Sequence, residues 1–470
     1  MVASHARPGL RAVTFDDGSA WTYDELLARA GGAAAWLDAG RAELGVPVPA
    51  FVPAGPAAFA LLLAGAMSHR PLAPFSPRFT VLELTACLDR LPPGPIVTDV
   101  AGRAVVARVA ERAGRPLLVL PEEFSVKDRP IPLDTSPDAT VAVVHTSGTT
   151  GLPKPVFQKQ GPLGRRVPQS ADPIKLGEGS VYATASAFHH QAGVGLVLVA
   201  LGAGATLVPV PHFSVESWKA LGDLGPTHAT VVPALLETLL AAGVLQLPTL
   251  RWLQYGSSPL HPDTARRLLT DFSGLRLVQQ LGQTEGSPIT TLHHEDHLDA
   301  VAGPLHRLKS VGRPVPHSEL RIESPDPDGV GEICSRAAHY FAPDPDGWLR
   351  TGDLGRLDED GFVYLAGRRN DAINRGGETV YPVEVEQVIA AHPGVLEVAV
   401  AGRPDRRLGQ VPHAFVVPVH PESPPAAAEL MAFSRQRLAG YKVPRDWHVV
   451  DSLPRNPSGK VLRRRLADGV

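Results

Sequence analysis

The sequence predicts an α/β protein with a large N-terminal domain of parallel-rich sheets with flanking helices, followed by a small mobile α+β C-terminal domain. Three observations support this prediction. Apolar strand-like runs alternate with helix-like segments through most of the chain. These runs repeatedly end in small or polar residues, and after Gly355 the pattern changes to a hairpin followed by a segment rich in charge and glycine.

Length and composition indicate a folded, globular chain. The 470 residues suggest two to four domains at roughly 150 residues each. Gly 45 and Pro 47 together make about 20% of the chain, below the roughly 25–30% that marks low-complexity sequences. With 44% apolar residues, the chain has enough hydrophobic surface to form a large core.

Charge and cysteine content exclude several classes of function. The net charge of -3 offers no basic excess to attract nucleic acid or an anionic membrane. Cys87 and Cys334 lie far apart and outside any zinc-ligand spacing, which is typical of reduced buried thiols. The first 20 residues contain no apolar signal region, so we expect a cytoplasmic protein. The uncharged stretch 179–215 is interrupted by Gly202, Gly204 and Pro209, which favours a buried core element over a membrane span.

The expected strands of the large domain share polar carboxyl ends. Helix-like segments such as 234–243 and 261–272 lie between them, and this alternation predicts parallel strands covered on both faces. Ligands of such sheets bind at the carboxyl ends of the strands. The candidate site segments are therefore those that follow VAVVH (141–145), TLVPV (206–210), HATVV (228–232), RWLQY (251–255) and RLVQQ (276–280).

The C-terminal part predicts a compact α+β unit. Two alternating runs flank Asp360-Gly361, a strong signal for a β-hairpin. The charged and glycine-rich residues 368–377 indicate a hinge. A helix at 380–392, strands at 395–402 and 414–419 and a helix to Gly440 are expected to follow it. We therefore divide the chain into residues 1–369 and 370–470.

Two glycine- and lysine-containing turns are candidates for binding phosphate. Residues 146–154 follow an expected strand and combine hydroxyl groups, two glycines and Lys154. Backbone N–H groups and hydroxyls of such a loop bind phosphate oxygens while the lysine supplies charge. The spacing differs from that of a Walker A loop. The second turn, residues 456–460, ends in Lys460 and taken alone is typical of a surface turn.

Together these motifs resemble the adenylate-forming superfamily of acyl-CoA synthetases, peptide-synthetase adenylation domains and firefly-type luciferases. HTSGTTGLPK (145–154) resembles its phosphate loop, GQTEG (282–286) its α-phosphate and Mg²⁺ motif, and WLRTGDLG (348–355) its ribose-binding segment. GRRNDAINRGGETVYPVEVE (367–386) resembles its hinge, and RNPSGK (455–460) the loop of its catalytic lysine. The resemblance covers about Asp138 to Arg464, with the motifs in the family's order.

The resemblance implies the following site. Lys460, Thr284, Glu285 and His189 are the expected catalytic residues, and Glu285 is the expected ligand of Mg²⁺. Asp353 and Arg368 are expected at the ribose, while Gly376 and Gly377 let a pantetheine arm approach closely. The expected cofactor-binding residues are Thr146, Ser147, Gly148, Thr149, Thr150, Gly151, Lys154, Gly256, Ser257, Ser258, Gly282, Gln283, Asp353, Arg368, Gly376 and Gly377.

The implied activity is the ATP- and Mg²⁺-dependent conversion of a carboxylic acid to an acyl-adenylate, followed by transfer to a thiol. The expected thiol is CoA or the phosphopantetheine of an acyl carrier protein, and the expected protein is a monomer or a homodimer. Residues 188–193 (FHHQAG) resemble the acyl-CoA synthetase form of the acid pocket and lack the Asp that binds an α-ammonium group. Tyr255, Gly256 and the strand leading to Gly282 are expected to line the same pocket. Capture by an amine or a hydroxyl, activation of an oxyanion such as nitrite, and a catalytically reduced binding protein remain as alternatives.

Three residues depart from the family's pattern. Pro155 stands where glycine is usual and removes a backbone donor at the end of the phosphate loop. Leu281 replaces an aromatic residue expected to stack on adenine, and Asn370 occupies the hinge position that usually holds Asp or Lys. These departures motivate the alternative of reduced catalysis, and the four residues Lys154, Glu285, Asp353 and Lys460 argue against it.

Overall fold

The computed structural model divides into two compact units. The first comprises Met1–Glu319 with Arg336–Leu349, and the second Leu320–Ser335 with Arg350–Val470. The structure describes residues 2–5, 9–76, 79, 81–121, 124, 126, 136–146, 154–210, 213–258, 260–376, 378–455 and 461–468. We describe each unit by itself.

A six-stranded sheet lies in the first unit, with the strand order β6-β5-β3-β4-β7-β8. Its strands run parallel except for β8, which pairs antiparallel with β7 at one edge. The bounds are β3 Val48–Phe51, β4 Leu72–Pro74, β5 Ile96–Thr98, β6 Leu117–Val119, β7 Thr140–Thr146 and β8 Lys154–Lys159.

The second sheet of this unit has nine strands in the order β15-β14-β13-β12-β11-β9-β10-β1-β2. The strands from β13 to β1 are parallel, and β2, β14 and β15 pair antiparallel at the two edges. The bounds are β1 Arg11–Thr14, β2 Ala20–Thr22, β9 Val181–Thr184, β10 Thr206–Pro209, β11 His228–Thr230, β12 Trp252–Gly256, β13 Arg276–Leu281, β14 Thr290–Leu292 and β15 Arg313–Pro314.

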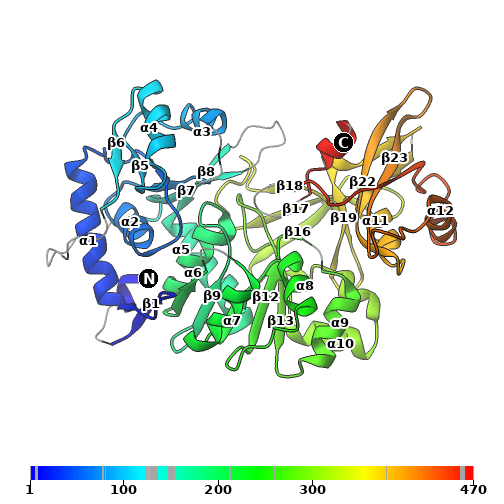
Figure 1. Cartoon of the computed structure of the whole chain (residues 1–470), viewed down its shortest axis with the longest axis horizontal. Coiled ribbons are helices and arrows are strands. Elements are labelled where there is room, and N and C mark those ends of the chain that lie inside the picture. The colour runs from blue at the N-terminus through cyan, green and yellow to red at the C-terminus, as the bar shows by residue number, and fades with distance from the viewer. Residues whose placement is uncertain are drawn as a thin grey trace. The chain divides into compact units, whose positions relative to one another are not determined.

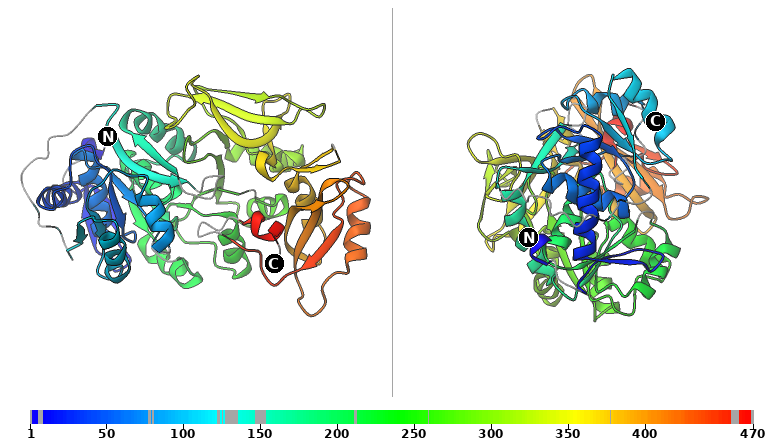
Figure 2. Two further views of the ribbon diagram at one scale, coloured as in Figure 1. Left: turned by 90° about the horizontal axis from the view of Figure 1, so that it is seen from above. Right: turned by 90° about the vertical axis from the view of Figure 1, so that its left-hand side faces the viewer.

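Apolar helices pack into one core with strands of both sheets. This core combines side chains of α1 (Tyr23–Ala39), α2 (Pro56–Met67), α5 (Gln160–Ala171) and α6 (Leu196–Gly202) with residues of β3, β7, β9 and β10. Figure 1 shows α5 and α6 next to β9, and the right-hand view of Figure 2 shows α1 along its length. The helix α2 is apolar around nearly its whole circumference because it is buried on all sides.

The outer faces of the two sheets are covered by further helices. Four helices pack on the nine-stranded sheet: α7 (Val215–Leu224), α8 (Pro233–Ala241), α9 (Pro262–Asp271) and α10 (His294–Ala302). The helices α3 (Val81–Leu88) and α4 (Arg103–Arg112) pack on the six-stranded sheet. Shorter helical turns are η1 Val2–His5, η2 Asp172–Ile174, η3 Gln191–Gly195, η4 Leu305–Lys309 and η5 Arg369–Asp371.

The second unit is built on two sheets. An antiparallel β18–β19 pair belongs to the four-stranded sheet β16-β17-β18-β19, which is yellow in Figure 2. The other sheet has the order β21-β20-β23-β22 with β24 paired to β23. The bounds are β16 Ser318–Glu323, β17 Gly331–Ala337, β18 Leu349–Leu357, β19 Val363–Arg368, β20 Ile373–Arg375, β21 Glu378–Val380, β22 Val395–Asp405, β23 Gly409–Pro418, β24 Asp446–Val449, α11 Pro382–Ala390, α12 Ala427–Arg435 and α13 Arg463–Asp468.

The predicted fold class is confirmed, including parallel sheets covered on both faces. The predicted hairpin around Asp360-Gly361 is the β18–β19 pair, in which Leu357 lies opposite Val363. The helix expected to continue to Gly440 ends earlier, at Arg435. The domain division at 369/370 stays a prediction. No helix in the described ranges is long and apolar enough to cross a membrane.

At Gly312 the backbone lies so close to Thr291 that we expect any side chain there to destabilise the fold. Its φ is +88°, and a Cβ there would lie 2.1 Å from the carbonyl carbon of Thr291. We expect Gly312→Ala to lower the free energy of unfolding by about 3 kcal/mol or more, because left-handed strain and overpacking add. The control Gly243→Ala has φ +67° with nothing within 4 Å, so it should lose only about 1–2 kcal/mol. Urea unfolding measures both, and equal losses would contradict the role of the close approach.

Candidate active site

The expected phosphate loop connects two strands that pair with each other. Thr146, the last residue of β7, lies opposite Lys154, the first residue of β8. The central part of β7 is buried, so the start of the loop is held by the core. Ser147, Gly148, Thr149, Thr150 and Gly151 lie outside the described residues.

Pro155 is accommodated by its position at the sheet edge. Pro155 lies on β8, the edge strand of the six-stranded sheet, and faces His145 of β7. An edge strand tolerates proline because its outer side carries no ladder hydrogen bonds. The departure from the usual glycine therefore fits the observed pairing of the two strands.

Two expected binding segments follow neighbouring parallel strands at the same sheet edge. Gly256, at the end of β12, lies opposite Gln280 of β13, so residues 256–258 and 282–285 start side by side. A Cβ on Gly256 would lie 2.7 Å from the carbonyl oxygen of Gln280, and one on Gly282 would lie 2.4 Å from Ser287 Oγ. Ser257 has φ +69°, a left-handed turn directly after the strand. Gly256 therefore permits close backbone packing, and Gly282 permits close packing against Ser287.

The loop that carries Thr284 and Glu285 is held by backbone hydrogen bonds. Gln283 N donates to Gly286 O at 2.9 Å, and Gly286 N donates back to Gln283 O at 3.2 Å. The carbonyl oxygen of Glu285 accepts from Phe341 N at 2.8 Å and from Ala342 N at 3.0 Å. These bonds fix the backbone on which the two side chains stand.

The carboxylate of Glu285 fits the expected magnesium ligand. No described residue donates a hydrogen bond to this carboxylate, so its oxygens are available. The described part of the chain also contains no cluster of three or more His, Cys, Asp or Glu residues that would hold a metal by itself. Mg²⁺ commonly takes one or two protein carboxylates and completes its shell with phosphate oxygens and water. The donor set at Glu285 matches that preference.

A cluster of rings surrounds the two histidines of the expected acid pocket. The ring centroids of His189 and His190 lie 4.2 Å apart, and Phe79 lies 6.4 Å from His189. Phe75 lies 6.3 Å from Phe79 and 4.7 Å from His145, the residue before Thr146. The cluster therefore connects residues 188–193 with the start of the phosphate loop.

Two histidines of this cluster, His145 and His190, are predominantly uncharged at neutral pH. Burial lowers the pKa of His145 to about 4 and lowers that of His190 below its usual value. Neither nitrogen of His145 has a hydrogen-bond partner among the described residues. A buried imidazolium would lose hydration without compensation, so the neutral form is favoured. These rings present apolar and weakly polar surface. The catalytic assignment of His189 stays a prediction.

A row of polar side chains that the sequence pattern did not indicate crosses the face of the nine-stranded sheet that carries α5. Tyr182 Oη lies 2.6 Å from Thr230 Oγ1, which donates to Gln254 Oε1 at 3.1 Å. Gln254 Nε2 donates to Gln280 Oε1 at 2.7 Å, and Gln280 Nε2 donates to Gln169 O of α5 at 3.2 Å. The only sequence signal was the glutamines within otherwise apolar strands. Periodicity alone does not show that residues of four strands meet.

Tyr255 lies on the opposite face of that sheet. The sequence suggested that it lines the acid pocket together with Gly256. It is buried with the core of α7–α10, and its hydroxyl lies 2.8 Å from His297 Nε2. Gln254 and Gln280 occupy the face that packs against α5, because successive residues of a strand point to opposite faces.

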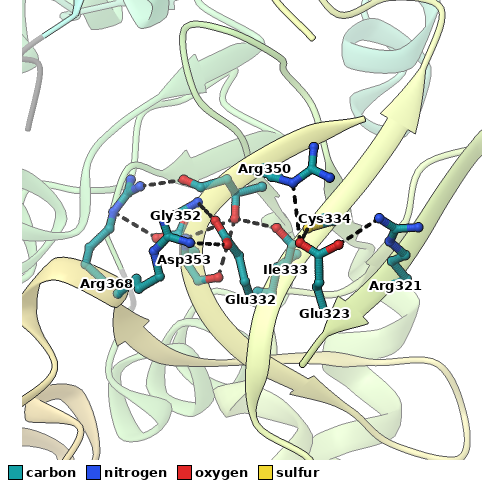
Figure 3. A network of polar contacts seen from close by, with 11 residues as sticks. Arg321, Glu323, Glu332, Ile333, Cys334, Arg350, Gly352, Asp353 and Arg368 are labelled. Carbon is teal, nitrogen blue, oxygen red and sulfur yellow. Dashed lines mark hydrogen bonds and ion pairs between the residues drawn. The ribbon is translucent and has the colours of Figure 1, made fainter. Parts of the chain in front are cut away.

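Asp353 and Arg368 lie directly opposite each other in the second unit. They pair across β18 and β19, and Arg368 Nε lies 2.8 Å from Asp353 Oδ1. Arg368 Nη1 donates to Thr351 O at 3.0 Å, and Asp353 N donates to Thr351 Oγ1 at 3.0 Å. Figure 3 shows this network continuing to Glu332, which accepts from Gly352 N at 3.0 Å. The two expected ribose-binding residues thus form one preorganised group.

The remaining predicted residues lie near the hinge and the C-terminus. Gly376 has φ +63°, and its N–H donates to Leu408 O at 2.7 Å. Asn370 lies in the short turn η5. Lys460 and Gly377 lie outside the described residues. Arg455 and Val461 form an antiparallel bridge that flanks the segment containing Lys460.

Comparison with known proteins identifies both parts of the chain. Residues 2–342 match the family model described as AMP-binding enzyme, and residues 384–460 match that of the AMP-binding enzyme C-terminal domain. The fatty acid–[acyl-carrier-protein] ligase ScoC of Streptomyces coeruleorubidus is 33% identical over 445 residues, covering 87% of this chain and 84% of that protein.

Two further relatives are named as ligases or synthetases of CoA thioesters. The 2-succinylbenzoate–CoA ligase of Bacillus licheniformis is 36% identical over 349 residues, covering 70% of each chain. The solved structure of O-succinylbenzoate coenzyme A synthetase from Bacillus subtilis, in complex with ATP and magnesium ion, superposes with a TM-score of 0.86 at 28% identity. That match covers 99% of this chain and 98% of the solved one.

The buried His145 predicts a pH dependence of stability. Its pKa is about 4 in the folded protein and about 6.5 when exposed, so the unfolded chain binds the additional proton between these values. Stability from this residue is therefore present above pH 6.5 and is lost as the pH falls toward 4, by about 2 kcal/mol at pH 5.

We expect His145→Phe to reduce the loss of Tm between pH 7.5 and pH 5, because phenylalanine keeps the ring contact with Phe75 and cannot be protonated. Other buried histidines retain their own contribution, so the comparison is with the wild-type difference. The exposed His420 supplies the control variant His420→Phe, which should leave the difference unchanged. An equal pH response of His145→Phe and the wild type would contradict the assignment.

Proposed function

Because the chain belongs to the family of AMP-binding enzymes, we propose that the residues described above activate a carboxylic acid with ATP. The protein is an AMP-forming acid–thiol ligase that uses ATP and Mg²⁺ and resembles acyl-CoA synthetases. It forms an acyl-adenylate with release of pyrophosphate and then transfers the acyl group to a thiol.

The observation that carries the assignment of the nucleotide site is the sheet edge where residues 256–258 and 282–285 start side by side. Loops at the carboxyl ends of adjacent parallel strands are where α/β proteins bind ligands. The two glycines permit close backbone packing there, and the available carboxylate of Glu285 lies on the same loop as Thr284. This combination supports binding of the nucleotide and its metal at one edge.

The proposed roles in adenylation follow from where negative charge develops. An oxygen of the acid attacks the α-phosphorus of ATP, and pyrophosphate leaves with the bonding electron pair of the broken P–O bond. The oxygens around phosphorus gain charge in this step, so fixed cations and hydroxyl donors stabilise it. We assign Thr284 and Lys460 to the reacting α-phosphate, and Thr146 to Gly151 with Lys154 to the remaining phosphates. Mg²⁺ held by Glu285 neutralises phosphate charge when it is bound.

Asp353 is assigned to the two ribose hydroxyls, with Arg368 as its positioning residue. An ionised carboxylate accepts hydrogen bonds from two hydroxyls more strongly than a neutral amide does. The ion pair with Arg368 and the bond from Asp353 N to Thr351 support a fixed carboxylate orientation. This arrangement favours ribose binding without prior rearrangement of the side chains.

The acceptor is proposed to be CoA or a carrier-protein phosphopantetheine. ScoC is named as a ligase that uses an acyl carrier protein, and the 2-succinylbenzoate ligases as ones that use CoA. Gly376, which carries no Cβ, supports a close approach of the pantetheine arm. We place the protein in the cytoplasm, where CoA and carrier proteins are found, as a monomer or a homodimer. Capture by an amine or a hydroxyl remains the alternative.

Pyrophosphate release tests the proposed function directly. We expect release with ATP and Mg²⁺ to depend on one class of acid in a panel of aryl, short aliphatic, long aliphatic and amino acids. Addition of CoA or a phosphopantetheinylated carrier protein should increase turnover and give a thioester detectable by mass spectrometry. The variant Lys460→Ala should lose acid-dependent release by about 100-fold or more. Absence of release with every acid would overturn the proposal.

Asp353→Asn tests the ribose assignment. We expect the KM for ATP to rise about 10-fold or more, because hydrogen bonds to a charged group contribute about 1.5–3 kcal/mol. The control Asp405→Asn also removes a carboxylate that pairs with an arginine, Arg445, in the same unit. Steady-state kinetics should show an unchanged KM for ATP in this control. An unchanged KM in Asp353→Asn, or equal changes in both variants, would contradict the assignment.

A further inference from the structure

Arg166 is a buried cation with no counter-charge in the described structure. It lies on α5, and its residue is only 2% exposed to solvent. Its Nε and Nη1 atoms are buried and have no hydrogen-bond partner among the described residues. Burial lowers the pKa of Arg166 to about 10, so the guanidinium is still charged at neutral pH. A buried charge without a partner is strongly unfavourable, and such groups are normally paired with an anion.

The neighbours of Arg166 supply further donors and no anion. A Cβ on Gly195 would lie 2.5 Å from Arg166 Nη1 and 2.8 Å from Gln191 Nε2, so these two nitrogens converge beside Gly195. Gln191 Nε2 is likewise buried without a partner among the described residues, while its Oε1 accepts from Gln158. Burial raises the pKa of the nearby Tyr182, whose phenol therefore stays neutral. The group is rich in N–H donors and carries a net positive charge.

This group adjoins the segment assigned to the acid pocket. Gln191 belongs to residues 188–193 and begins the turn η3, whose last residue is Gly195. One turn after Arg166 on α5, the carbonyl of Gln169 accepts from Gln280, the last residue but one of β13 before Gly282. Tyr182, Thr230, Gln254 and Gln280 continue the polar surface across the sheet. A wholly aliphatic substrate gains nothing from these donors, whereas an acid with a second anionic group satisfies them.

We propose that Arg166 and Gln191 bind a second carboxylate of the acid that is activated, which makes the substrate a dicarboxylic acid. This inference rests on the proposed ligase function. The carboxylate that reacts with ATP is at one end of the substrate, and the second carboxylate accepts hydrogen bonds from the guanidinium and from the Gln191 amide. Hydrogen bonds between charged partners are stronger than neutral ones, so the pair orients the substrate as well as binding it. Gly195 leaves space for both donor groups, since a Cβ there would displace the ends of both side chains.

Matched pairs of acids test the proposal. Succinic, glutaric, adipic and phthalic acids are each compared with their monoamides, which keep the size and remove the second charge. We expect wild-type kcat/KM in pyrophosphate release to favour at least one diacid over its monoamide by 100-fold or more. Arg166→Met should reduce this preference to less than about fivefold. Arg165→Met, which alters an exposed arginine next to it on α5, should retain the wild-type preference.

A binding measurement separates recognition from turnover and from folding. The preferred diacid should raise the Tm of the wild type and of Arg165→Met in the absence of ATP, and its monoamide should not. If Arg166→Met does not fold, Gln191→Leu replaces it in both measurements. This variant should lower the diacid preference at least 10-fold, and it should need at least 10-fold more diacid for the same rise in Tm. Activation of monoacids or monoamides as efficient as that of diacids would overturn the proposal while leaving the ligase function intact. Absence of release with every acid would instead overturn the ligase function.

Discussion

Burial of apolar helices between two largely parallel sheets is the constraint on which the first unit depends. The helices α2 and α6 belong to one core that includes strands of both sheets, so the sheet faces that line this core are shielded from solvent. Parallel strands covered on both faces place their carboxyl ends at one edge, and the loops leaving that edge cannot enter the core. The segments with glycine, hydroxyl and carboxylate groups therefore gather at that edge. Close packing against the Gln280 carbonyl at Gly256 and against Ser287 at Gly282 leaves little room for side chains there.

The same interior determines the charge state of the polar groups that enter it. His145 and His190 are neutral because burial disfavours their protonated forms. The hydroxyl and amide groups from Tyr182 to Gln280 form hydrogen bonds with one another across four strands. Arg166 differs, since a guanidinium keeps its charge when it is buried. The unpaired guanidinium and the unpartnered amide nitrogen of Gln191 beside it are both accounted for by an anion that binds during function.

In the second unit, the position of the candidate site residues depends on the register of paired strands. The turn between β18 and β19 and a register shift between Leu354 and Gly355 together set which residues face each other. The register beyond this shift places Asp353 opposite Arg368. Their ion pair and the bonds to Thr351 hold both side chains before any ligand binds. A shift of one residue would turn the two side chains to opposite faces of the sheet. The hairpin is therefore as important to the proposed ribose contact as the acidic residue itself.

The sequence by itself determined the fold class, the β18–β19 hairpin and the motifs, because these depend on local periodicity, turn chemistry and short-range spacing. It placed Gly256 and Gly282 at strand ends correctly. Tertiary structure decided what no local pattern contains: that Tyr255 faces the core of α7–α10, that glutamines of separate strands form one row, and that Arg166 is buried without a counter-charge. These features depend on which strands are neighbours and which face a helix covers. Such long-range contacts are set by the packing of the whole chain.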